Sequence, residues 1–131
     1  MDPIADLLTI IRNAQAVGKD KVELSHSTAK EALARLLKDS GYLGEVRVFK
    51  VSGKSYKRLS LSLRYVAGRP AAGHIERISK PGKRVYASSD GLPQALRGGA
   101  GLVVVSTSRG LLTVAEAKKR RVGGEIICKV W

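Results

Sequence analysis

Three consecutive hydroxyl side chains stand near the C-terminal end of this 131-residue chain: Ser106, Thr107 and Ser108. They end the apolar run in "LVVVSTSRG" and could act as nucleophiles only if a base lay within hydrogen-bond reach. The chain has two histidines, His26 and His74, and neither stands in a signature such as G-x-S-x-G. The acidic residues are scattered singly, without paired carboxylates or metal-ligand spacing. We therefore expect no enzymatic activity, no cofactor, no small-molecule substrate and no metal.

The same hydroxyls suit recognition, because a hydroxyl can bond base edges, phosphate oxygens and ribose 2′-OH groups at close range. The alternative is a turn in which Ser and Thr hydroxyls bond local backbone groups. Arg109 follows them at once, and the basic run "KKRR", residues 118–121, stands shortly after. These basic neighbours favour a surface that binds nucleic acid.

The charge of the whole chain supports this interpretation. Lys and Arg number 24 against 11 Asp and Glu, a formal net charge of +13, and the second half of the chain is the more positive. Such a surplus indicates a negatively charged partner, with nucleic acid favoured over an acidic membrane surface or mere solubility. Aromatic residues make up only 5% of the chain, which disfavours a platform that stacks single-stranded bases and favours a structured RNA. No helix-turn-helix or zinc-finger signature supports a DNA-binding module.

The single cysteine, Cys128, cannot form an internal disulfide and is expected to be a small buried side chain in a strand. The chain shows no targeting signal and no apolar run near the roughly 20 residues of a membrane span. We expect a cytoplasmic protein without a membrane partner.

The first half of the chain predicts a small α+β lobe. An N-terminal helix is predicted, because Asp2 can cap it and Pro3 suits its first position. The segment "KVEL" is predicted to form a short strand. A capping box of Thr28 and Glu31 predicts a second helix, which Gly41 ends. The alternation in "LSLSLRY" predicts a strand that pairs with the preceding "VRVFKV". The small-residue segment "AGRPAAG" then marks a boundary, with lobes at 1–66 and 67–131.

The second lobe is predicted to be mostly β. Two strands, "HIERIS" and "KRVYAS", are predicted to flank the turn "KPG". After them, "LPQAL" suggests a helical turn and "RGGAG" suggests a further turn. The segment "LVVVST" is predicted to form a strand. A capping box of Thr113 and Glu116 predicts a helix over "VAEAKKRRV", which Gly123 and Gly124 end before the strand "EIICKVW". The fold class is therefore α+β in two small lobes, the second with short helices.

Two further features bear on binding. The run of residues 118–121 spans every side of a helical turn, so only some of its side chains can face one partner. Tyr86 could stack on a splayed base or pack at a strand edge.

Four stretches together resemble one protein family: "DPIADLLTIIRNA", "KPGKRVY", "VVVSTSRGLLT" and "VGGEIICKVW". In register over nearly the whole chain, they resemble the bacterial form of the small-subunit ribosomal protein eight family. The resemblance implies a two-lobe α+β fold that binds an irregular helix in the central domain of small-subunit rRNA and helps assemble the platform. It also implies neighbouring small-subunit ribosomal proteins as partners, a place in the small ribosomal subunit, no homo-oligomer, and the messenger RNA of its own operon as a further candidate partner.

The resemblance also implies which residues meet the RNA. The hydroxyl turn contacts the core of the RNA helix, Gly124 and Glu125 line the same surface, Tyr86 lies near it, and Lys30 touches another RNA segment. Glu125 either accepts hydrogen bonds from base amino groups or pairs with a basic residue of the protein. The expected RNA-binding set is Ser106, Thr107, Ser108, Arg109, Gly110, Gly124, Glu125, Tyr86, Ser88, Lys30, Arg12, Asn13, Lys118 and Arg121.

Overall fold

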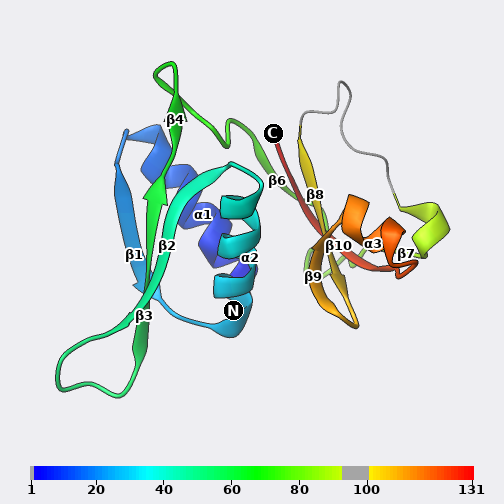
Figure 1. Ribbon diagram of the computed structural model, residues 1–131, viewed down its shortest axis with the longest axis horizontal. Helices are drawn as coiled ribbons and strands as arrows, with labels where there is room; N and C mark the ends of the chain where they lie inside the picture. Colours follow the sequence, from blue (N-terminus) through cyan, green and yellow to red (C-terminus); the bar gives the residue numbers. More distant parts are fainter. Residues whose placement is uncertain (1, 93–100) are drawn as a thin grey trace. The chain divides into compact units, whose positions relative to one another are not determined.

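The chain folds into two compact units, Met1–Ala72 and Gly73–Trp131, each built of a β-sheet and at least one helix. The structure is a computed structural model that describes residues 2–92 and 101–131 (Figure 1). The expected α+β class is confirmed. The units divide after Ala72 rather than Val66, because β4 (Tyr65–Val66) pairs with β5 (Arg69–Pro70) and keeps the intervening residues with the first unit.

The N-terminal helix α1 (Pro3–Ala16) begins as its sequence predicts. Asp2 is extended, and its Oδ1 accepts hydrogen bonds from the backbone N–H groups of Ile4 and Ala5 at 3.0 and 3.3 Å. Pro3 takes the first helical position, where its missing N–H costs nothing. The predicted cap and helix are confirmed.

The second helix, α2 (Thr28–Asp39), corrects the prediction at its first turn. Ser27, not Thr28, is the N-cap: its backbone is extended and its Oγ accepts from the Lys30 N–H at 3.1 Å. The Glu31 carboxylate does not complete a capping box, because it bonds His26 Nε2 and Arg35 Nε, both at 2.8 Å. The predicted end is confirmed, since Gly41 follows the last turn at φ +88°.

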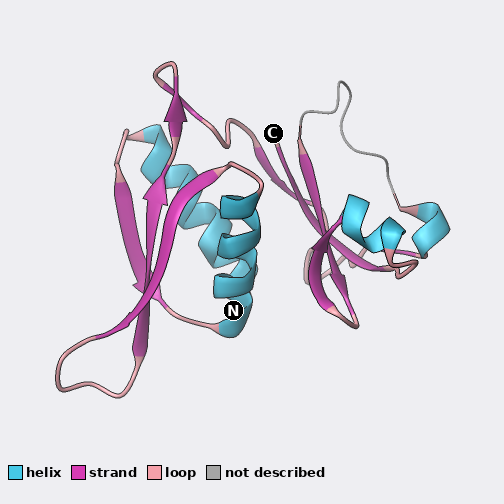
Figure 2. Cartoon of the chain, viewed as in Figure 1, coloured by secondary structure: helices cyan, strands magenta, loops and turns pink. Residues whose placement is uncertain are grey.

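The first unit has a three-stranded antiparallel sheet with β3 (Lys57–Leu63) between β1 (Lys21–Ser25) and β2 (Leu43–Lys50). Both helices cover one face of it (Figure 2). Leu59, Leu61 and Leu63 are buried, as the alternation in "LSLSLRY" predicts, but Ser60 between them is buried as well. The segment expected only as a boundary contains the β4–β5 hairpin, whose turn places Ala67 and Gly68 at φ 53° and 78°.

The second unit is built around β10 (Gly124–Val130). One edge of β10 pairs with β8 (Leu102–Thr107), which in turn pairs with β9 (Gly110–Thr113). The other edge pairs with β6 (Ile75–Arg77) near one end and with β7 (Tyr86–Ala87) near the other. The expectation that β6 and β7 flank one hairpin is corrected: the turn exists, with Lys80 and Lys83 exchanging backbone hydrogen bonds, but both strands find their ladder partner in β10.

The helix α3 (Val114–Lys119) covers one face of this sheet and is shorter than expected. Thr113 Oγ1 accepts from the Glu116 N–H at 3.1 Å, which confirms the predicted start. The helix ends before the glycines, because Arg121 turns into the left-handed region at φ 57° and Val122 N–H bonds the Ala117 carbonyl. Behind α3 lies an apolar cluster that includes Leu92, Val103, Val105, Val114, Ala117 and Ile126.

Two further expectations can be placed. The turns predicted in "LPQAL" and "RGGAG" fall largely on residues 93–100, outside the described residues; just before them, Ser89–Gly91 form the short helix η1. Cys128 is fully buried in β10 as expected, and burial raises the pKa of its thiol to about 12. Among the described helices, none is long and apolar enough to cross a membrane.

Candidate nucleic-acid interface

The hydroxyl stretch forms the end of β8 and its turn into β9, and its three hydroxyls differ in what they bond. Thr107 Oγ1 donates to the Gly110 carbonyl at 2.8 Å and accepts from the Arg109 N–H at 3.0 Å. Gly110 adopts φ +95°, a conformation that closes a hairpin turn and that other residues avoid. Thr107 and Gly110 therefore build the turn itself, as the alternative interpretation of these hydroxyls requires.

The two serines remain available. Ser106 is partly exposed and Ser108 is exposed, and within the described ranges 2–92 and 101–131 neither hydroxyl has a hydrogen-bond partner. Arg109 lies beside them, also exposed. The turn thus presents two unpaired hydroxyls and a guanidinium to a partner, on a hairpin whose shape Thr107 maintains.

Three predicted residues lie in one row across three neighbouring strands. Glu125 in β10 stands opposite Tyr86 in β7 on one side and opposite Ser106 in β8 on the other. Residues directly opposite each other in antiparallel strands project from the same face of a sheet. Tyr86 is 68% exposed, so its ring is accessible for stacking rather than packed against the strand edge. A ring, a carboxylate and a hydroxyl therefore share one surface.

The two glycines before Glu125 permit this close assembly. A Cβ atom on Gly124 would overlap the Ser106 carbonyl, and one on Gly123 would overlap the Ala87 carbonyl and approach the Ser88 Cα at 2.7 Å. No larger residue fits between these backbones without displacing a strand. The glycines thus bring β7, β8 and β10 together at the end of the sheet where the predicted residues lie, including Ser88.

The Glu125 carboxylate is held by residues that sequence reasoning did not single out. Its Oε2 accepts from Ser79 Oγ at 2.5 Å and from Arg84 at 3.0 Å, and 17% of its side chain is exposed. Burial raises the pKa of this carboxyl, but the hydrogen bonds from Ser79 and Arg84 and the nearby guanidinium charges together outweigh burial and lower the pKa from its ordinary value. The only sequence signal was the presence of Arg84 in the motif "KPGKRVY".

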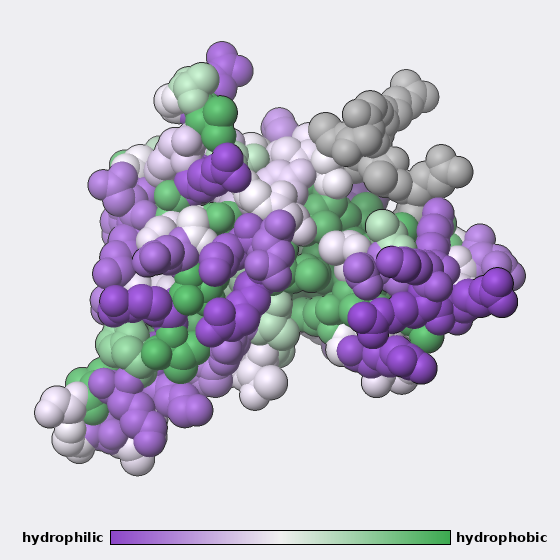
Figure 3. Space-filling model, in the orientation of Figure 1, coloured by the Kyte–Doolittle hydropathy of each residue, from purple (hydrophilic) through white to green (hydrophobic). Residues whose placement is uncertain are grey.

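The basic run 118–121, which begins in the last turn of α3, divides between different environments. Arg120 Nε pairs with Glu116 at 3.4 Å, whereas Lys118 and Arg121 line a surface hollow together with Ser89 and Asp90. Figure 3 shows hydrophilic side chains gathered over α3. The expectation that the run does not face one partner as a whole agrees with this division.

The residues expected in the first unit form no comparable cluster. Lys30 is buried, and its Nζ bonds Asp6 Oδ2 at 2.9 Å, Ser25 Oγ at 3.1 Å and the Ser25 carbonyl at 3.3 Å. With 7% of its side chain exposed, Lys30 joins α2 to α1 and β1, so this geometry gives no support to contact with RNA. Arg12 and Asn13 are exposed on α1.

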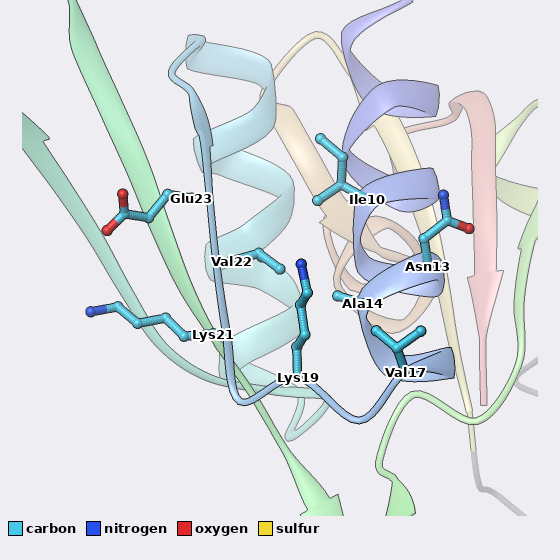
Figure 4. A pocket seen from close by; sticks show the side chains of 8 residues that line it. All are labelled: Ile10, Asn13, Ala14, Val17, Lys19, Lys21, Val22 and Glu23. Atoms are coloured by element: carbon cyan, nitrogen blue, oxygen red, sulfur yellow. The ribbon is translucent and has the colours of Figure 1, made fainter.

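Asn13 also borders a groove between α1 and β1. Ile10, Ala14, Val17 and Val22 supply apolar side chains to this groove. Figure 4 shows Val22 turned toward α1, whereas Lys21 and Glu23 point to the other side of β1.

Each of the two histidines is engaged by another side chain. His26 bonds Glu31 in the first unit, and the His74 ring stacks on Trp131 with centroids 5.2 Å apart. In the described part of the chain, no three His, Cys, Asp or Glu side chains lie close enough together to hold a metal ion.

Comparison with known proteins shows which family the chain belongs to. The family model described as "Ribosomal protein S8" matches residues 2–131. The small ribosomal subunit protein uS8 of Saccharophagus degradans is 45% identical over 130 residues, which cover 99% of this chain and 97% of that protein. The uS8 protein of Thiobacillus denitrificans is 48% identical over 129 residues, 98% of this chain and 96% of its own length. These are names of ribosomal proteins and not of enzymes, and the chain belongs to the ribosomal protein S8 family.

Proposed function

We propose that this protein is a constituent of the small ribosomal subunit in the cytoplasm and binds small-subunit rRNA directly. Its target is an irregular helix in the central domain, and this binding helps assemble the platform beside neighbouring ribosomal proteins. The protein acts as a monomer, without cofactor or catalysis. The observation that carries the proposal is the row of Tyr86, Glu125 and Ser106, next to the exposed turn of Ser108 and Arg109.

The row of Tyr86, Glu125 and Ser106 and the neighbouring turn distinguish the target RNA from other nucleic acids. The hydroxyls of Ser106 and Ser108, which have no partner among the described residues, suit ribose and base edges, and the exposed Tyr86 ring suits a splayed base. The Glu125 carboxylate repels phosphate but accepts from amino or hydroxyl donors, so it favours an irregular helix with accessible base edges over a regular duplex.

The basic groups supply attraction. The chain carries a net charge of +13, and Arg109, Lys118 and Arg121 are exposed in the same unit as the row. Each phosphate contact releases counterions, which makes affinity salt-dependent but largely independent of sequence. We therefore propose residues 73–131 as the principal RNA-binding unit, with Arg12 and Asn13 as lesser contacts and Lys30 as a structural residue.

Footprinting of the purified protein on whole small-subunit rRNA tests the proposal. Protection confined to one irregular helix of the central domain is expected. Competition with duplex DNA of equal length should leave that protection unchanged, and equal displacement by DNA would contradict specific recognition of RNA. The same footprinting on the messenger RNA of the protein's own operon would test binding to that RNA, which repression of its own synthesis requires. We propose this repression as a second role on the resemblance alone.

A further inference from the structure

We propose that Ser79 is a positioning residue for RNA recognition. Its buried hydroxyl holds the Glu125 carboxylate in one orientation beside Tyr86 and Ser106, so that Glu125 meets the RNA as a fixed acceptor for amino or ribose hydroxyl donors. This inference rests on the proposed function, because it assigns a role within that binding surface.

The hydrogen bonds of Ser79 give its hydroxyl one direction. Ser79 is fully buried, and its Oγ accepts from the Val85 backbone N–H at 3.0 Å. An amide N–H cannot accept in return, so the hydroxyl proton is free to point at Glu125 Oε2, 2.5 Å away. A hydroxyl whose lone pair and proton are both engaged inside the protein cannot swing toward solvent. Ser79 therefore joins β10 to the segment that leads into β7.

The orientation of Glu125 follows from this bond and a second donor. Oε2 receives both the Ser79 hydroxyl and the Arg84 guanidinium, so two donors from one segment restrain the same oxygen. Without them, a partly exposed carboxylate would sample several rotamers and lose orientational freedom on binding RNA. A restrained acceptor avoids that loss and rejects ligands whose donors lie elsewhere.

The groups that face Glu125 also keep it charged. Arg77 in β6 and Arg84 before β7 are the nearby cations, Tyr86 in β7 stands opposite, and Ser106 in β8 is neutral. Burial raises the pKa of Glu125, but the bonds from Ser79 and Arg84 and the nearby guanidinium charges together lower it from its ordinary value. The carboxylate is ionised at neutral pH, and loss of the Ser79 donor should raise its pKa.

The test compares Ser79→Ala and Ser79→Cys with the parent in the full-length chain. Cysteine nearly preserves the side-chain volume and is only a weak donor, so it serves if alanine disturbs folding. Ser60→Ala is the matched control, since Ser60 is a buried serine of β3 in the other unit. Carbon NMR of the free protein gives the Glu125 pKa. Titrations with a small-subunit rRNA transcript and with an unrelated structured RNA of equal length give the ratio of the two affinities.

Both Ser79 variants should raise the Glu125 pKa and lower the affinity ratio by about tenfold, through weaker binding of the rRNA alone. The slope of log affinity against log salt should not change, because no cation is removed. An unchanged pKa, or a raised pKa with an unchanged ratio, overturns the inference and leaves the proposed function standing. A parent chain without preference for the rRNA would refute the proposed function itself.

Discussion

The three adjacent hydroxyls of the β8–β9 turn should respond to alanine substitution in two different ways. Thr107 bonds the Gly110 carbonyl and the Arg109 N–H, whereas the hydroxyls of Ser106 and Ser108 have no partner in the described part of the chain. Thr107→Ala should therefore destabilise the hairpin, and Ser106→Ala and Ser108→Ala should act on RNA binding alone.

The magnitudes follow from the bonds. Two hydrogen bonds at an exposed turn contribute about 1–2 kcal/mol in total. Their loss would lower the melting temperature of a unit the size of residues 73–131 by roughly 4–8 °C per kcal/mol. Removal of an unpaired surface hydroxyl should change stability by less than about 0.5 kcal/mol. If RNA buries the Ser106 or Ser108 hydroxyl, its loss should weaken specific binding by about 1–3 kcal/mol, or roughly 5- to 150-fold.

Two measurements separate these effects. Circular dichroism during heating gives the melting temperature, and filter binding to small-subunit rRNA across a salt series gives the affinity and its salt dependence. Both serine variants should melt like the parent, bind the rRNA less tightly, and keep the parental salt slope. Folded serine variants with parental affinity for the rRNA would show that the stretch is only a turn. A Thr107→Ala variant that melts like the parent would show that its two hydrogen bonds contribute nothing.

Four other substitutions or treatments give separate expectations. Arg121→Gly should relieve the left-handed backbone at φ 57° and stabilise the chain by about 1 kcal/mol, measured by urea unfolding. The same substitution should weaken binding to any RNA and reduce the slope of log affinity against log salt by about one, measured by salt titration. Lys30→Ala should destabilise the chain to urea by about 1–3 kcal/mol while the salt slope stays parental; a reduced slope would instead make Lys30 a phosphate contact. Gly124→Ala should cost about 3 kcal/mol or more in a urea melt, because its Cβ meets the Ser106 carbonyl. Cys128, with its pKa raised to about 12, should resist iodoacetamide at pH 8 until the protein unfolds, and rapid labelling of the folded chain would contradict its burial.

Much of the fold could be predicted because it depends on neighbours in the chain. The cap at Asp2, the alternation that buries Leu59 and Leu61, the cap at Thr113 and the glycine after α2 each involve residues a few positions apart. Even so, choices between adjacent residues failed: Ser27 rather than Thr28 caps α2, because the chain leaving β1 is still extended at Ser27. Local patterns set the kind of element better than its first residue.

Pairing between distant segments was not readable in the same way. β6 and β7 flank a short turn and could have formed a hairpin, yet both pair with β10, which offers the complementary edge only in the folded unit. Lysine side chains usually lie at the surface, but the packing of α1 against α2 buries the Lys30 amine beside Asp6.

The sequence by itself determined the family, the excess of positive charge and the hydroxyl stretch, because these are properties of residue type and order. Only the tertiary structure decided which hydroxyls of that stretch stay unpaired, and that Glu125 is held by Ser79, 46 residues earlier in the chain. The physical reason is that a hydroxyl bonds whichever donor or acceptor the fold brings within about 3 Å, and the sequence around it does not show which atom that will be.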